Sequence, residues 1–62
     1  MENNTVEIWL KVVHQTKLAY LTNDGGTLNW LPKSQVEILD SAEGEEYLMS
    51  VPEWLALDNG LI

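Results

Sequence analysis

The stretch KLAYLTNDGGTLNWLP, residues 17 to 32, decides the fold because it reads as a β-hairpin. Two short apolar runs flank NDGG, and Asn, Asp and Gly tolerate the positive φ angles that a tight hairpin turn requires. We therefore predict strands near residues 17–22 and 27–31. Pro32 has no backbone N–H to donate to a neighbouring strand, so it should end the second of them.

The segment before this hairpin also predicts a strand. Residues 5 to 14, TVEIWLKVVH, alternate apolar side chains with others and are rich in β-branched residues. An apolar period of two is typical of a strand with one buried face. The apolar positions of that face are Val6, Ile8, Leu10 and Val12.

The segment after the hairpin predicts a turn and a second hairpin. PKSQ, residues 32 to 35, should redirect the chain in a single turn. VEILD and YLMSV then flank SAEGEE, with Gly44 at the tip of the loop. On the first of these strands we expect Val36 and Ile38 to point to one face, and Glu37 and Leu39 to the other.

The last segment, PEWLALDNG at residues 52 to 60, predicts a short helix. Pro52 suits the first helical position, Glu53 suits the first turn, where the helix dipole favours an anion, and Gly60 suits the stop. The helix should pack on the sheet through an apolar face. We expect that face to contain Trp54, Leu55, Leu57 and Leu61.

These elements predict a mainly β (α+β) fold in a single domain, residues 1–62. We expect a five-stranded antiparallel meander, curled into a half-barrel or small open barrel, with one short carboxy-terminal helix over part of a face. A chain this short buries only about 60% of the surface that its unfolded form exposes, so its stability should be marginal.

Composition limits the chemistry and the compartment. The chain has no cysteine, which excludes disulfides and thiolate metal sites and suits a reducing cytoplasm. We expect no secretory signal, because no basic region precedes an apolar run, and no transmembrane segment. The prediction is a soluble cytoplasmic protein.

Catalytic and metal sites are not predicted. His14 is the single histidine and has no cysteine as a partner, and the serines lack a nucleophile elbow. DSAEGEE, residues 40 to 46, lacks the spacing of a calcium loop. We expect a protein that is not an enzyme and that takes no cofactor and no metal. A minimal enzyme that uses its carboxylates remains an alternative from another class.

The charge is uneven. The net charge is −7, and residues 36 to 62 hold seven acidic side chains without a lysine or arginine. Such an asymmetry attracts basic surfaces, whereas three lysines are too few to hold free nucleic acid. One interpretation is that these carboxylates only keep the edge of the hairpin solvated and have no binding role. The functional interpretation is a partner-binding site of Glu37, Asp40, Glu43, Glu45 and Glu46, with Glu53 and Asp58 behind them.

The spacing of these carboxylates favours mimicry of a phosphate backbone. Residues on one face of a strand are about 6.6 Å apart, and phosphates of one DNA strand advance by about 3.4 Å along the axis. An acidic hairpin therefore presents charge on a similar scale. Trp9, Trp30 and Trp54 are expected in or over the core, and an exposed aromatic surface is the alternative.

Two motifs carry a resemblance. WLPKSQVE at 30 to 37 and VPEWLALDNGLI at 51 to 62 resemble a set of very small phage and prophage proteins with Trp-Leu-Pro-Lys-Ser-Gln and Pro-Glu-Trp-Leu-Ala…Gly-Leu-Ile motifs. The match covers about a third of the chain and implies phage origin. Its shared residues are interpreted as fold determinants: Trp30, Pro32, Lys33, Ser34, Gln35, Pro52 and Trp54.

Small, acidic, non-enzymatic phage proteins also resemble anti-CRISPR inhibitors that mimic DNA, by size and charge and not by motif. The resemblance implies a cytoplasmic location in the bacterial host and, as partner, a basic DNA-binding subunit of a CRISPR or other defence complex. The leading hypothesis is a monomeric inhibitor of this kind, without direct nucleic acid or membrane binding. The alternative is a non-catalytic phage accessory module that binds through an aromatic and aliphatic surface.

Overall fold

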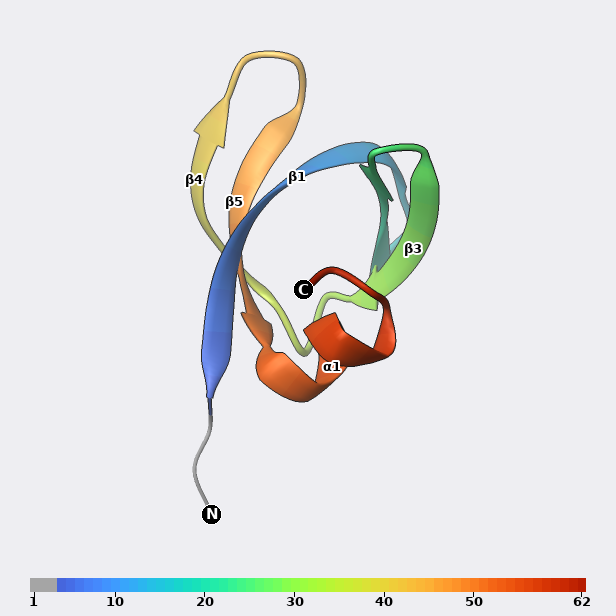
Figure 1. Cartoon of the computed structure of the whole chain (residues 1–62). Coiled ribbons are helices and arrows are strands. Elements are labelled where there is room, and N and C mark those ends of the chain that lie inside the picture. The colour runs from blue at the N-terminus through green and yellow to red at the C-terminus, as the bar shows by residue number, and fades with distance from the viewer. Residues whose placement is uncertain (1–3) are drawn as a thin grey trace.

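The computed structural model describes residues 4–62 and contains five strands and one helix (Figure 1). All strand pairs are antiparallel and belong to one open sheet, which curls around the helix. The mainly β fold class with one short carboxy-terminal helix is confirmed. In chain order the elements are β1 Thr5–Gln15, β2 Ala19–Asp24, β3 Thr27–Pro32, β4 Glu37–Ala42, β5 Glu46–Pro52 and α1 Glu53–Asp58.

The strand order, however, is not that of a consecutive meander. It is β3-β2-β1-β5-β4, so β3 and β4 follow each other in the chain but form opposite edges of the sheet. Pro32 ends β3, and the Gln35 N–H donates to the Pro32 carbonyl at 3.0 Å in a turn that redirects the chain. The second hairpin then joins the sheet through β5, which pairs with β1 from Thr5↔Pro52 to Lys11↔Glu46.

The turn of the first hairpin has the predicted chemistry. Gly25 and Gly26 connect the Asp24↔Thr27 pair and have φ angles of 61° and 97°. A two-residue loop with positive φ at both positions matches the right-handed twist of its strands, and glycine adopts it without strain. The Gly26 N–H also donates to the Asn23 Oδ1 at 2.8 Å. The strands extend to Asp24 and Thr27, two residues further at β2 than predicted.

Two β-bulges interrupt the alternation of side chains. In β1 the register against β2 shifts between Val12 and His14, and in β4 the register against β5 shifts between Ile38 and Asp40. A bulge leaves one extra residue unpaired and reverses which later positions point to each face. The extra residues are Val13 and Leu39, which are 43% and 44% exposed.

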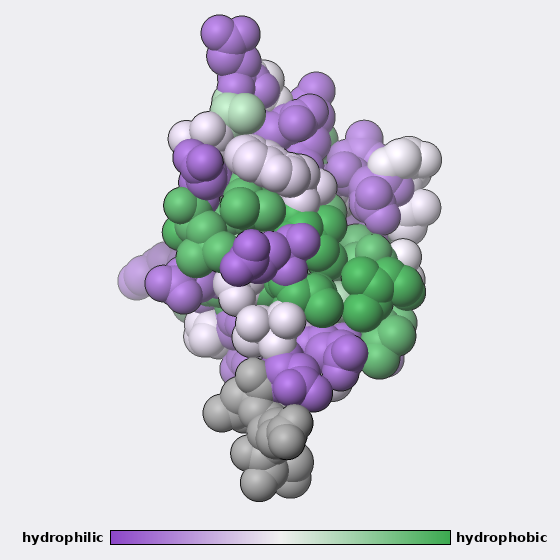
Figure 2. Space-filling view, turned by 60° about the vertical axis from the view of Figure 1, so that its left-hand side comes forward, coloured by the Kyte–Doolittle hydropathy of each residue, from purple (hydrophilic) through white to green (hydrophobic). Residues whose placement is uncertain are grey.

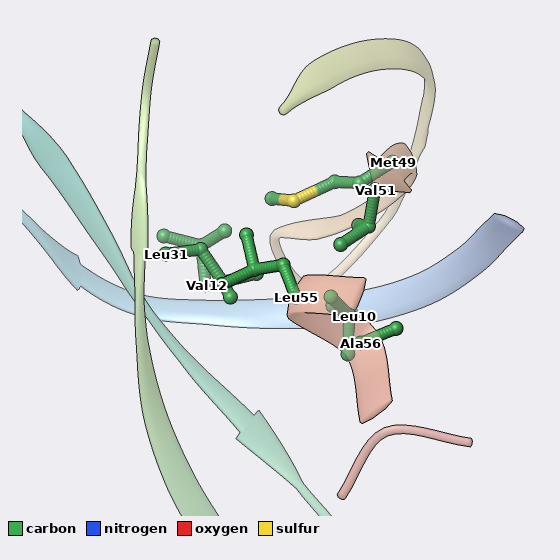
Figure 3. Packing of buried hydrophobic residues seen from close by; sticks show 7 residues of the cluster. All are labelled: Leu10, Val12, Leu31, Met49, Val51, Leu55 and Ala56. Carbon is green, nitrogen blue, oxygen red and sulfur yellow. The ribbon is translucent and has the colours of Figure 1, made fainter. Parts of the chain in front are cut away.

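The core lies on the inner face of the curled sheet, beneath the helix (Figure 3). It combines side chains from β1, β3, β5 and α1, all with at most 6% of their surface exposed. The predicted inward alternation of β1 is confirmed at Leu10 and Val12. The buried apolar residues are Leu10, Val12, Leu31, Met49, Val51, Leu55 and Ala56, and the polar Thr22 of β2 is buried as well.

The helix begins one residue later than predicted and buries a different face. Pro52 is the N-cap, with φ −55° and ψ 139°, and Glu53 is the first helical residue. Leu55 and Ala56 are buried, whereas Trp54 and Leu57 are 60% and 59% exposed. The predicted apolar face is therefore wrong for Trp54 and Leu57. Positions 54 and 57 lie only about 60° apart around a helix, and both face solvent because Leu55 and Ala56 fill the space above the sheet.

The helix ends as Gly60 predicts. Gly60 has a φ of 70°, its N–H donates to the Leu57 carbonyl at 3.2 Å, and the Leu61 N–H donates to the Ala56 carbonyl at 2.8 Å. This pair of bonds is a Schellman motif, which turns the chain back across the last helical turn. The turn brings Leu61 against the core.

The turn after β3 explains part of the WLPKSQ motif. The Lys33 N–H donates to the Leu18 carbonyl at 2.8 Å, and its Nζ donates to the Gln15 Oε1 at 2.8 Å. The same Nζ lies 4.8 Å from the centre of the Tyr20 ring, a cation–π contact. Lys33 therefore joins the ends of β1, β2 and β3.

Candidate functional site

The outer face of β1, β5 and β4 holds three of the seven predicted binding residues, Glu37, Asp40 and Glu46. Antiparallel partners point to the same side of a sheet, and the partners of buried Leu10, Met49 and Val51 define the inner side. The alternate positions therefore form the outer side. We call these nine residues the acidic face: Glu7, Trp9 and Lys11 of β1, Ser50, Leu48 and Glu46 of β5, and Glu37, Asp40 and Ala42 of β4.

The bulge in β4 is what places two carboxylates together. Glu37 and Asp40 are three residues apart and would point to opposite faces of a regular strand. The extra residue Leu39 shifts the register, so Glu37 pairs with Ser50 and Asp40 pairs with Leu48, both outer positions of β5. Both acidic residues are exposed. Leu39 was predicted to share a face with Glu37, but it is the unpaired residue of the bulge.

The loop of the second hairpin extends the acidic face beyond the sheet. Glu43, Gly44 and Glu45 connect the Ala42↔Glu46 pair, and both glutamates are exposed. Gly44 and Glu45 have φ angles of 77° and 62°. Thus all five hairpin carboxylates that the sequence singles out lie on the acidic face or at its tip.

One lysine offsets part of the negative charge of the acidic face. Lys11 lies directly opposite Glu46 in the β1–β5 ladder and is the one basic residue among the nine. Sequence reasoning missed it because the pairing of β1 with β5 joins residues far apart in the chain. Sequence reasoning also missed Glu7, which lies in one row with Ser50 and Glu37.

The structure does not bring Glu53 and Asp58 to the hairpin tip. Glu46 begins β5 and Glu53 follows its last residue, which separates them by about 23 Å at 3.3 Å per residue. Figure 1 shows the hairpin loop and α1 at opposite ends of the molecule. Asp58 is exposed at the far end of the helix, and Glu53 is half-buried.

The tryptophans are not core residues, so that prediction is wrong. Trp9, Trp30 and Trp54 are 48%, 49% and 60% exposed. The core is filled by aliphatic side chains, and Tyr20 and Tyr47 pack against its margin. Among the described residues, ten large apolar side chains are exposed, and the three tryptophans are among them.

A second cluster continues the outer side of the sheet across β1, β2 and β3. His14 pairs with Leu21, and Leu21 pairs with Trp30, so the three side chains form one row. The His14 and Trp30 rings meet edge to face, with centres 6.4 Å apart and an angle of 84°. With Leu28, which is 58% exposed, they form what we call the aromatic face.

The side of the molecule that carries β4 and the start of β1 mixes the two kinds of surface. Figure 2 shows apolar side chains in a band across the middle of this side, with hydrophilic side chains above, below and between them. An acidic surface with apolar side chains at its centre combines two means of binding a protein. Charge steers the encounter, and apolar area holds the complex.

Residues 4–62 contain neither a cluster of metal ligands nor a helix long enough to span a membrane. Within that range, no three potential metal ligands of the His, Cys, Asp and Glu types come together. The single helix of the same range has six residues, too few to cross a bilayer.

The fold and surface define a small, open, antiparallel β-sheet protein with one short helix and an exposed acidic face. No family model matches the chain, and neither a curated protein nor a solved structure is significantly similar to it. The chemistry of the exposed surface is therefore what indicates a function.

Proposed function

We propose that this protein is a non-catalytic, phage-encoded inhibitor that binds the basic DNA-recognition groove of a host defence complex, in the manner of an anti-CRISPR DNA mimic. The observation that carries the proposal is the exposure of all five hairpin carboxylates on one face and its tip. The partner is a protein surface rich in lysine and arginine, and DNA is what the inhibitor displaces.

The electrostatics support a mimic over a DNA-binding protein. A chain with a net charge of −7 repels a phosphate backbone, and it is attracted to a groove that such a backbone fills. Antiparallel pairing fixes Glu37 and Asp40 on β4 and Glu46 on the adjacent strand β5, and neighbouring strands lie about 4.8 Å apart in the hydrogen-bonding direction. The sheet holds the backbone of these residues in place, so binding of the partner costs little backbone conformational entropy.

The proposal is tested with Glu43, Glu45 and Glu46 replaced together by glutamine. The parent protein, immobilised and exposed to a bacterial lysate at low and high salt, should capture a DNA-binding protein, and duplex DNA should release it. The triple variant should retain its fold and lose that capture, because close charge pairs across an interface contribute roughly 1.5–7 kcal/mol each in coupling.

A charge-matched control replaces Asp24, Glu53 and Asp58 by their amides. This variant also loses three charges, but at residues outside the second hairpin, and it should still capture the partner. Equal capture by the parent and the hairpin variant, or a captured protein that DNA does not release, would disprove the mimic.

The second candidate is an accessory module that binds through the aromatic face. It is favoured by the half-exposed Trp30 and its neighbours His14, Leu21 and Leu28. Under this alternative, Trp30→Ala should abolish capture and the glutamine triple variant should not. Salt should also have little effect, because apolar contacts are not screened.

A further inference from the structure

The centre of the acidic face is aromatic. Trp9 lies in one row with Leu48 and Asp40, and its neighbours on the same strand and the same side are Glu7 and Lys11. The indole is 48% exposed. A large aromatic side chain that is half-exposed among carboxylates gains only part of the stabilisation that full burial would give, which points to a bound state that covers it.

The chemistry of this arrangement distinguishes arginine from lysine. An indole face attracts a cation through its quadrupole, and tryptophan is the best aromatic residue for this contact. A guanidinium is planar and weakly hydrated, so it stacks on a ring while its N–H groups bind carboxylates. An ammonium group is compact and strongly hydrated, and it cannot do both as well.

We propose that the acidic face binds an arginine-rich segment of the partner, with one guanidinium stacked on Trp9 and paired with the neighbouring carboxylates of Glu7, Asp40 or Glu46. This inference rests on the proposed function and names the side chain that the surface selects. Trp9 provides the platform, and the surrounding carboxylates provide the charge.

Charge complementarity favours this occupant over the alternatives. A nucleic acid would bring phosphates against Glu7, Glu37, Asp40 and Glu46. A second copy docked through the same face would oppose the same carboxylates to one another, and Lys11 alone would offset them. A purely apolar partner would bury the carboxylates without a counter-charge, which costs free energy.

The experiment uses the peptides hexa-arginine and hexalysine, titrated at low salt into the full chain. In a variant with Trp30→Phe and Trp54→Phe, Trp9 is the one remaining indole, so its emission reports binding at this face. Calorimetry gives the two dissociation constants. Hexa-arginine should bind about two- to fivefold more tightly than hexalysine, the range of an exposed cation–π contact, and should change the Trp9 emission.

Two variants test whether the arginine preference comes from the Trp9 ring or from the carboxylates around it. Trp9→Leu keeps an apolar side chain and should bind both peptides with equal affinity, whereas Trp9→Phe should keep a reduced preference for arginine. The matched control is Trp30→Leu, which removes the equally exposed indole of the aromatic face. That variant should retain the full preference.

Equal binding of the two peptides by the parent, or an arginine preference that persists in Trp9→Leu, would overturn the inference. The proposed function would survive either result if the glutamine triple variant of the hairpin bound both peptides more weakly. Failure of both peptides to bind would overturn the inference and the electrostatic basis of the proposed function together.

Discussion

The backbone N–H of Val12 donates a hydrogen bond of 3.0 Å to the carbonyl of Glu45, which joins the long central strand to the loop of the acidic hairpin. This bond continues the β1–β5 ladder one step beyond Lys11↔Glu46. It holds Glu45 at a φ of 62°, a left-handed conformation that side chains other than glycine and asparagine seldom adopt. The loop therefore keeps a carboxylate where glycine would be more stable.

Glu45→Gly should raise the free energy of unfolding by about 0.5–1 kcal/mol, because the left-handed conformation costs a residue with a Cβ more than glycine loses in chain entropy. Urea unfolding followed by circular dichroism measures the change. Glu45→Gln removes the same charge but keeps the Cβ, so its gain should be smaller. If both substitutions stabilise the protein equally, charge repulsion and not backbone strain is the cause.

Gly60→Ala should lower the free energy of unfolding by about 1–2 kcal/mol. An alanine Cβ at this position would meet no atom within 4 Å, so the cost would come from the φ of 70° alone. Thermal denaturation of Gly60→Ala and of Gly60→Asn measures it, and asparagine should lose less because it tolerates this conformation. A loss from asparagine as large as that from alanine would contradict this account of the helix stop.

Met49→Ala should leave the protein largely unfolded at 25 °C. Met49 has no exposed surface, and truncation of a buried methionine costs about 2–5 kcal/mol. A core of this size rarely contributes more than about 3–5 kcal/mol in total. Met49→Leu conserves volume and should lose less than about 1.5 kcal/mol. Thermal unfolding measures both effects. A cooperative transition in Met49→Ala at a temperature close to that of the parent would show that core packing does not limit the stability of the fold.

Ionic quenchers should distinguish Trp9 from Trp30, although the two side chains are equally exposed. Cs⁺ accumulates near the carboxylates around Trp9 and I⁻ is repelled, whereas Trp30 lies among neutral neighbours. In variants that retain one tryptophan, the ratio of Cs⁺ to I⁻ quenching should be higher at Trp9. High salt should reduce the difference through screening, and equal ratios at low salt would argue against a local negative potential.

Local signals made much of the fold predictable. Gly25 and Gly26 marked the first hairpin because both turn positions need a positive φ, and Pro32, Pro52 and Gly60 marked ends that their backbone geometry imposes. Each of these features depends on a few adjacent residues. The fold class followed from the elements that they separate.

Three features had no local signal. Nothing in the chemistry of Val13 or Leu39 marks a bulge, yet the Leu39 bulge decides that Glu37 and Asp40 share a face. The pairing of β1 with β5 joins residues as far apart in the chain as Thr5 and Pro52. Neither the edges of the sheet nor the place of Lys11 opposite Glu46 could therefore be predicted from local sequence. The exposure of Trp9 depends on the same pairing, which places its side chain on the outer face.

The pairing of β1 with β5 also divides the protein into two pieces. Residues before the turn at Lys33 form β1, β2 and β3, residues after it form β4, β5 and α1, and one short connection links the two groups covalently. All the other contacts between the halves are non-covalent, so the molecule is built like a complex of two peptides. Two synthetic fragments divided within that connection should reassemble on mixing, and the acidic fragment could then be varied without resynthesis of the rest.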